Sequence, residues 1–182
     1  DIFTLLIIKT AADINNWEVI SRRDNEMKGK TVKESRIIMS QMMTQQDANL
    51  AGNVHGGVIM KLVDSVAGAV AIRHSRTNVV TAAIDRLNFH HPVYIGDMIT
   101  FEASVNLVGR TSMEVGVSVK SENLRTGEVQ NTATAYLTLV ALDEDGKPAV
   151  IPSLILETDE DVRRNRDAQK RREIRLSEKD TV

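Results

Sequence analysis

One long apolar stretch, followed by a change of period, constrains the fold of this chain more than any other feature. From Val58 to about His74, apolar residues recur at helical spacing, and small residues among them permit close packing. After Thr77 the pattern alternates, as in MITFEASVNL, where every second residue is apolar. The sequence therefore predicts one buried helix covered by half-buried strands.

Short connections indicate how those strands pair. A strand is predicted before the helix at residues 35–44, and four more follow it at 79–89, 98–107, 112–122 and 129–142. The turns at 108–111 and 125–128 are too short for parallel crossovers, so we expect an antiparallel meander. A twisted antiparallel sheet that curls round one helix is an α+β fold.

The chain divides into a central domain and two terminal segments, which we predict at 35–152, 1–34 and 153–182. The first segment is an N-terminal extension with no periodicity that ties it to the domain. Because Met27 begins a start-like stretch, residues 1–26 are either an added upstream extension or a genuine N-terminal arm.

The C-terminal segment reads as a charged helix and tail. Thr158 and Asp161 have the spacing of a capping box, with Asp in place of the usual Glu or Gln. We expect a solvated helix from there to about Arg175, with the densest basic segment of the chain on it.

Composition excludes several classes of protein. The 182 residues include no cysteine, which rules out a disulfide framework, a thiolate nucleophile and a cysteine-based zinc site. A net charge of −2 gives no basic field for nucleic acid. The opening DIFTLLIIK is too short to span a bilayer and makes a poor signal peptide. We expect a soluble cytoplasmic protein that binds neither nucleic acid nor membrane.

Gly56 and Gly57 stand directly before the helix. The first N–H groups of a helix are unpaired and carry partial positive charge, and two glycines remove the side chains that would block a ligand from them. This start can hold an oxyanion. The alternative is a tight turn or close helix–sheet packing.

Asp64 is an isolated acid inside the apolar stretch. It follows Gly57 by seven residues, about two helical turns, and so returns to nearly the same side of the helix. It either faces a site there or shares an exposed stripe with Lys61 and Ser65.

Three polar residues precede the helix and could take part in chemistry. The amides of Asn49 and Asn53 can polarise a carbonyl or orient a water, although turn residues are the commoner use of Asn in such loops. His55 could act as a base, because its ordinary pKa is near 6.5.

Other catalytic patterns find no support. His90 and His91 precede a proline at a strand end without a carboxylate cluster, so they read as structural or surface residues and no metal site is expected. The chain contains no G-x-S-x-G elbow, G-x-G-x-x-G turn or P-loop.

Several stretches resemble the hotdog-fold acyl-CoA thioesterases, specifically the cytosolic, brain-type acyl-CoA hydrolase group. DANLAGNVHGGVIMKLVDSVAGAVAIRH is similar to the loop and central helix of that family, TNVVTAAIDRLNFHHPVYIGD to its next strand and turn, and TSMEVGVSVKSENLRTGE to its hairpin. The resemblance covers residues 34–175, including the charged segment LILETDEDVRRNRDAQKRR.

The resemblance implies a hotdog fold, an antiparallel sheet wrapped around one long central helix. Hotdog domains pair into dimers that share the active site, and this group commonly builds trimers of dimers. In relatives the catalytic pair is a loop Asn and a helix Asp from different domains. These match Asn49 and Asp64, with Asn53 the neighbouring alternative.

The implied reaction is hydrolysis of acyl-CoA to a fatty acid and coenzyme A, without a cofactor. The N–H groups of Gly57 and Val58 would stabilise the oxyanion. Asp64 would be general base or nucleophile, and the sequence does not choose between these roles. Further contacts with substrate or coenzyme A are expected from Asn53, His55, Gly56, Arg110, Thr111 and Ser112.

Two other functions fit the same residues. A hotdog dehydratase acting on hydroxyacyl thioesters would use a loop His with a helix acid, and His55 with Asp64 superficially matches that pair. A non-enzymatic acyl-CoA-binding protein would keep the fold and lose Asn49 or Asp64, yet both are present.

Overall fold

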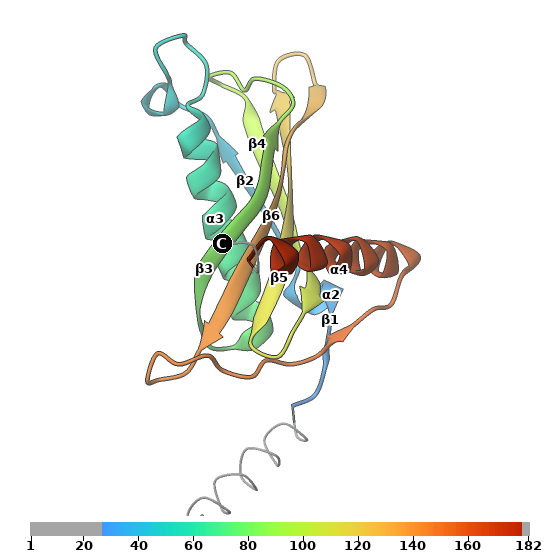
Figure 1. Ribbon diagram of the computed structural model, residues 1–182. Coiled ribbons are helices and arrows are strands. Elements are labelled where there is room, and N and C mark those ends of the chain that lie inside the picture. The colour runs from blue at the N-terminus through green and yellow to red at the C-terminus, as the bar shows by residue number, and fades with distance from the viewer. Residues whose placement is uncertain (1–26, 180–182) are drawn as a thin grey trace, which may run out of the picture.

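A five-stranded antiparallel sheet curves around one long helix (Figure 1). The computed structural model describes residues 27–179, so the prediction about residues 1–26 lies outside the described part. The sheet consists of β2 (Ile37–Met42), β3 (Asn78–Phe89), β4 (Met98–Val108), β5 (Ser112–Asn123) and β6 (Glu128–Leu142), and the helix is α3 (Gly56–Ser75). The predicted α+β class, a sheet wrapped around a central helix, is confirmed.

Smaller elements complete the chain. They are β1 (Lys30–Thr31), α2 (Val32–Ser35), the 3-10 turn η1 (Gln45–Asp47), β7 (Leu154–Ile155) and the C-terminal helix α4 (Asp159–Lys179). Within residues 27–179, no helix combines the length and apolarity that crossing a bilayer requires.

The strand order is β2-β4-β5-β6-β3, with every neighbouring pair antiparallel. The expected meander is therefore correct for β4, β5 and β6 and wrong for β3, which pairs with β6 at the far edge. β4 takes β2 as its other neighbour, so residues 90–97 carry the chain across the end of the sheet to reach it. The result is a sheet with β2 and β3 as its two edges.

One face of α3 fills the concave side of this sheet. Its buried residues are Ile59, Val63, Val66, Ala67, Val70 and Ala71, and they pack against inward residues of the strands that include Phe101, Val117, Leu137 and Leu139. Met60, Asp64 and Ile72 lie on the exposed part of the helix. Within one chain the sheet therefore covers one face of α3 and leaves another open.

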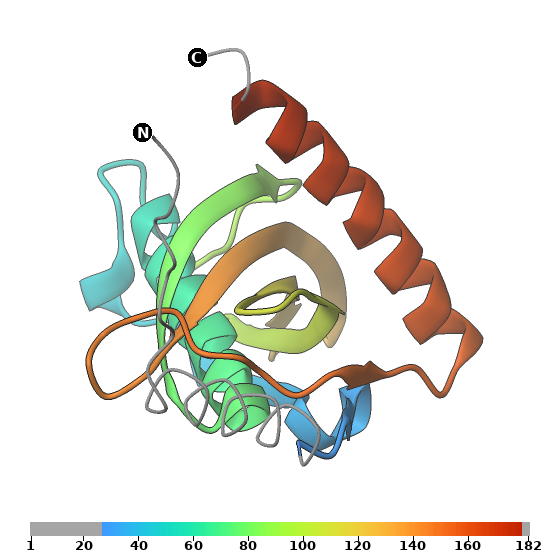
Figure 2. The same ribbon diagram turned by 60° about the horizontal axis from the view of Figure 1, so that its bottom comes forward.

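The convex side of the sheet is covered by α4, which crosses the strands (Figure 2). Ala168 is fully buried there, and Asn165 donates to the carbonyl oxygen of Asn106 at 2.8 Å. The expectation of a solvated helix is wrong for this face. For the same reason Ser104 and Asn106, which alternation assigns to the polar side of β4, are buried.

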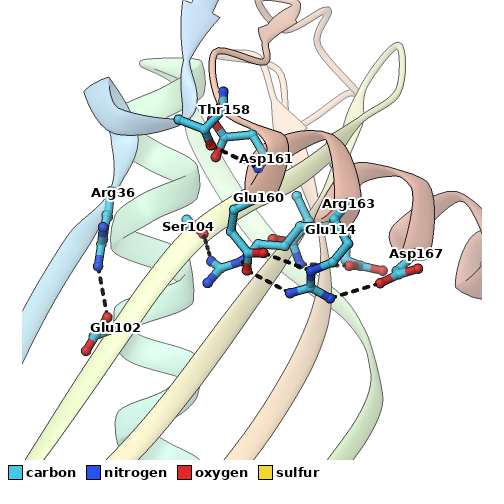
Figure 3. A network of polar contacts seen from close by, with 11 residues as sticks. Arg36, Glu102, Ser104, Glu114, Thr158, Glu160, Asp161, Arg163 and Asp167 are labelled. Carbon is cyan, nitrogen blue, oxygen red and sulfur yellow. Dashed lines mark hydrogen bonds and ion pairs between the residues drawn. The ribbon is translucent and has the colours of Figure 1, made fainter.

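Ion pairs fix α4 on the sheet (Figure 3). Arg171 holds the buried carboxylate of Glu114 with two hydrogen bonds, of 2.7 and 3.1 Å, and its guanidinium lies 3.7 Å above the ring of Tyr136. Thr158 and Asp161 exchange hydrogen bonds of 3.1 Å, so the predicted capping box is confirmed. The bidentate ion pair between Arg171 and the buried carboxylate of Glu114 anchors α4 more strongly than exposed ion pairs would, because exposed pairs contribute little to stability.

Residues near the start of the described chain bind the C-terminal end of α3. Lys30 donates to the carbonyl oxygens of Arg73 and His74, at 3.1 and 2.6 Å, where the last turn of the helix leaves them unpaired. β1 pairs in parallel with β7 beside this contact. Residues 30–31, predicted as part of an extension, thus lie against the domain.

His74 is a buried titratable group at this end of α3. Its Nε2 donates to the carbonyl oxygen of Pro152 at 2.9 Å, and Nδ1 lies 3.4 Å from the hydroxyl oxygen of Ser35. Burial, which penalises the charged imidazolium, lowers the pKa of His74 below its ordinary value of 6.5.

The depressed pKa of His74 predicts acid sensitivity of the fold. Below pH 6.5 the unfolded chain binds a proton at His74, whereas the folded chain resists that proton. The contribution of neutral His74 to the free energy of unfolding is therefore complete above pH 6.5 and is lost as the pH falls. His74→Asn should lower the free energy of unfolding at neutral pH by about 1–3 kcal/mol and flatten its pH dependence. Urea unfolding at neutral and mildly acidic pH measures both effects.

The matched control is His91→Asn, the same substitution at an exposed histidine. An equal slope for the parent and His74→Asn would contradict the assignment.

Candidate active site

The loop before α3 is held in shape by Asn49. Its side-chain oxygen accepts from the N–H groups of Ala51 at 2.8 Å and Asn53 at 3.2 Å, and its own N–H donates to the carbonyl oxygen of Asn53 at 2.7 Å. The Nδ2 group of Asn49 donates to no acceptor within residues 27–179. The turn role and the catalytic role of Asn49 are therefore compatible, since they use different atoms of the amide.

His55 is the N-cap of α3. In its extended backbone conformation, Nδ1 accepts from the N–H of Gly57 at 2.9 Å, while its carbonyl oxygen accepts from the N–H of Val58, also at 2.9 Å. Both N–H groups predicted for an oxyanion are thus already paired inside the chain. The N–H of Gly56 has no acceptor in the described part of the chain.

A hollow of about 300 Å³ opens beside this N–H group. Asn49, Asn53 and Gly56 line it from one side, and the residues Phe89 to Val93 line it from the end of β3 and the segment that follows. A Cβ at Gly56 would stand 3.5 Å from the ring of Phe89, an ordinary contact. The structure therefore places Asn49, Asn53 and Gly56 around one hollow.

Asp64 lies two turns further along α3, on its exposed part. Thr81, near the start of β3, donates from its hydroxyl to Oδ1 of Asp64 at 2.7 Å. The same two residues lie at one end of a second hollow, of about 450 Å³, between α3 and β3. Thr81 was not identified from the sequence, because in an alternating strand it is only one more outward polar residue.

Asn49 and Asp64 line separate hollows, so one chain does not assemble the predicted pair. Asp64 instead faces the side of the domain where β3 ends the sheet.

Arg110, Thr111 and Ser112 lie at the hairpin between β4 and β5. The carbonyl oxygens of Arg110 and Thr111 accept from Ile151 and Ala141, at the end of the sheet where α3 stops (Figure 1). Gly56 begins the same helix, which is about 30 Å long. These residues and the glycine turn are therefore not neighbours within one chain.

No metal site accompanies these residues. Within residues 27–179, no three His, Asp or Glu side chains come close enough to hold an ion.

Known proteins resemble this chain over most of its length. The thioesterase superfamily matches residues 51–128. An uncharacterized acyl-CoA thioester hydrolase of Bacillus subtilis, YkhA, is 37% identical over 147 residues, which span 81% of this chain and 86% of YkhA. An apo-hexameric acyl-CoA thioesterase of known structure is 38% identical, with a TM-score of 0.81 over 83% of this chain and 97% of its own.

An acyl-CoA hydrolase of Staphylococcus aureus adds information about residues. Its structure with butyryl coenzyme A, coenzyme A and coenzyme A disulfide is 32% identical, with a TM-score of 0.78 over 82% of this chain and 92% of its own. Structures of that enzyme also exist with an asparagine, an aspartate and a threonine each replaced by alanine. The three replaced residues are separated along that enzyme's sequence by the same numbers of residues as Asn49, Asp64 and Thr81 are along this one.

The sheet order, the helix inside it and these similarities agree with one another over most of the chain. The chain belongs to the hotdog-fold acyl-CoA thioesterase family.

Proposed function

We propose that this protein hydrolyses acyl-CoA thioesters to a carboxylic acid and coenzyme A, at a site shared by two chains. The observation that carries the proposal is the carboxylate of Asp64, held by Thr81 on an open face at the spacing found in the Staphylococcus aureus hydrolase. No cofactor is required, and the cytosol stays the predicted compartment.

The edge strand β3 is where the second chain would bind. It pairs with β6 on one side, and within residues 27–179 no strand pairs with its other side, which leaves a row of backbone N–H and C=O groups there. Val80 and Ile84 on this strand are 45% and 41% exposed. A long apolar edge strand of this kind is a template for another strand, and a second copy of β3 offers a matching one.

Two-fold pairing of β3 would also join the two halves of the site. In an antiparallel pair about the middle of β3, the Thr81 end of one copy lies beside the Phe89 end of the other. Thr81 binds Asp64, and Phe89 lies next to Gly56. The carboxylate of one chain would thus approach the glycine turn and Asn49 of its partner.

The reaction follows from these groups. Asp64 removes a proton from water as the water oxygen attacks the thioester carbonyl carbon. The tetrahedral oxyanion then collapses, the C–S bond breaks, and coenzyme A leaves as a thiolate. A thiol has a pKa near 8.5, so its departure needs little acid assistance. Direct attack by Asp64 would give an anhydride that water then opens.

The N–H of Gly56 is the best placed oxyanion donor. Gly57 and Val58 already donate to His55, whereas the N–H of Gly56 finds no acceptor among the residues that the structure describes, and Gly56 lines the hollow. We therefore propose the N–H of Gly56, in place of those of Gly57 and Val58, as the oxyanion donor. The free Nδ2 of Asn49 lies on the same hollow and can donate to the carbonyl oxygen or orient the water.

The residues proposed to bind the coenzyme A moiety lie far from the reacting groups within one chain. Arg110, Thr111 and Ser112 lie far from Gly56 along their own chain, so their proposed contacts would come from a neighbouring chain. Structures of relatives include hexamers, which supports such an assembly here, and a trimer of dimers is our proposal for it.

The dehydratase alternative would need His55 as a free base, but its Nδ1 is engaged with the N–H of Gly57. Thiol release from acyl-CoA distinguishes the two reactions, since a dehydratase gives an enoyl product and no free thiol. Binding without turnover would support the non-enzymatic alternative.

A mixing experiment tests the shared site. Asp64→Asn should lower thiol release by about 10²–10⁴-fold. Asn49→Asp should also be inactive, because it removes the Nδ2 donors while keeping an oxygen for the loop. When equal amounts of the two variants assemble together, half of the dimers carry one intact site. Activity should then return to about one quarter of the parent value.

A mixture no more active than its two components would contradict a site built from two chains. Size-exclusion chromatography of each variant and of the mixture confirms that the assemblies form.

Gly56→Pro tests the oxyanion donor by deleting one N–H group. Gly56 is the first residue of α3, where proline is well tolerated, and His55 has the extended backbone that a following proline requires. We expect kcat to fall about 10²–10³-fold. The measurement is thiol release, with circular dichroism as the check on folding.

Gly56→Ala is the matched control, since it adds a Cβ in ordinary contact with Phe89 and keeps the N–H. Equal activity of the proline and alanine variants would exclude this N–H as the donor.

A further inference from the structure

Gly68 lies in the middle of α3 without a conformational reason to be glycine. It is not among the described residues with positive φ, and a glycine inside a helix costs about 1 kcal/mol relative to alanine. Packing does not require it either, because a Cβ there would meet no atom within 4 Å. The missing side chain leaves open space.

That space belongs to the hollow of about 450 Å³ that begins at Asp64. Its apolar lining comes from α3, β3 and β6 and consists of Gly68, Ala69, Ile72, Val79, Val80 and Leu139. Polar groups of the lining gather at the Asp64 end, where Thr81 and Ser65 lie. An apolar ligand with one reactive polar end fits this distribution.

The spacing on α3 gives the hollow a direction. Asp64, Gly68 and Ile72 follow one another by four residues and share a face of the helix. With a rise of 1.5 Å per residue, Ile72 lies about 12 Å from Asp64 along the axis. A carboxylate, a gap and an apolar side chain thus stand in line, and Ile72 is 48% exposed.

We infer that the acyl chain of the substrate lies in this hollow, that the absence of a side chain at Gly68 lets the chain pass, and that Ile72 sets the longest chain accepted. The inference rests on the proposed thioesterase function and adds its substrate class. An extended chain advances about 3.5 Å for every three bonds, so 12 Å holds about ten bonds. Medium-length acyl chains of about ten carbons fill the hollow as far as Ile72.

Chain-length preference tests this inference. We measure kcat/KM by thiol release for butyryl-, decanoyl- and palmitoyl-CoA and compare ratios within each variant. Gly68→Leu fills the gap beside Asp64, so the decanoyl-to-butyryl ratio should fall at least about tenfold. Gly68→Ala fills less and should lower the ratio less.

Ile72→Ala provides the reciprocal change. It removes the apolar side chain at the far end, so the palmitoyl-to-decanoyl ratio should rise. Because Ile72 is half exposed, this variant tests the inference even if Gly68→Leu fails to fold.

Ratios equal to those of the parent protein, or rates that fall in parallel for every chain length, would overturn the inference. A parallel fall with loss of the oligomer would instead assign the hollow to contact between chains. A parent protein that hydrolyses none of the three substrates would overturn both this inference and the proposed function, whereas normal hydrolysis with unchanged ratios would overturn this inference alone.

Discussion

Burial of one face of α3 in the concave side of the sheet is the interaction on which the rest of the structure depends. It fixes the helix start beside the loop of Asn49 and sets the direction in which Asp64 points. Since the sheet covers only one face, the opposite face, with Asp64, Gly68 and Ile72, stays available. Fold stability and the chemistry of the site therefore use different sides of the same helix.

The two sides of the domain also differ in how their polar groups are paired. On the convex side, Arg171 and Arg164 of α4 bind Glu114 and Ser104, whereas the buried side-chain oxygen of Asn106 has no partner among the described residues. Along β3 and the start of α3, several groups have none in the described residues: the outer edge of β3, the N–H of Gly56 and Nδ2 of Asn49. The groups along β3 and at the start of α3 are at least partly exposed, so they are suited to bind a second chain and a substrate.

The sequence predicted the positions of the helices and strands better than it predicted which of them pack together. Periodicity identified α3 and the long strands, and the capping box of Thr158 was read from two residues. It did not reveal that β3 pairs with β6 or that α4 buries the polar side of β4, because both depend on contacts between distant segments. The candidate residues Asn49, Gly56 and Asp64 came from local patterns. The pairing of Gly57 with His55 and the bond from Thr81 to Asp64 needed coordinates, since nothing in the local sequence fixes them.

Cysteine cross-linking tests whether β3 of one chain pairs with β3 of another. The chain has no native cysteine, so single cysteines can be placed in turn at residues 82–86, with Ser40→Cys on the other edge strand, β2, as the control. Near a two-fold axis, equivalent residues come within disulfide distance of each other. On oxidation we expect a covalent dimer from at least one β3 position and none from Ser40→Cys. Monomers from every β3 position would contradict it.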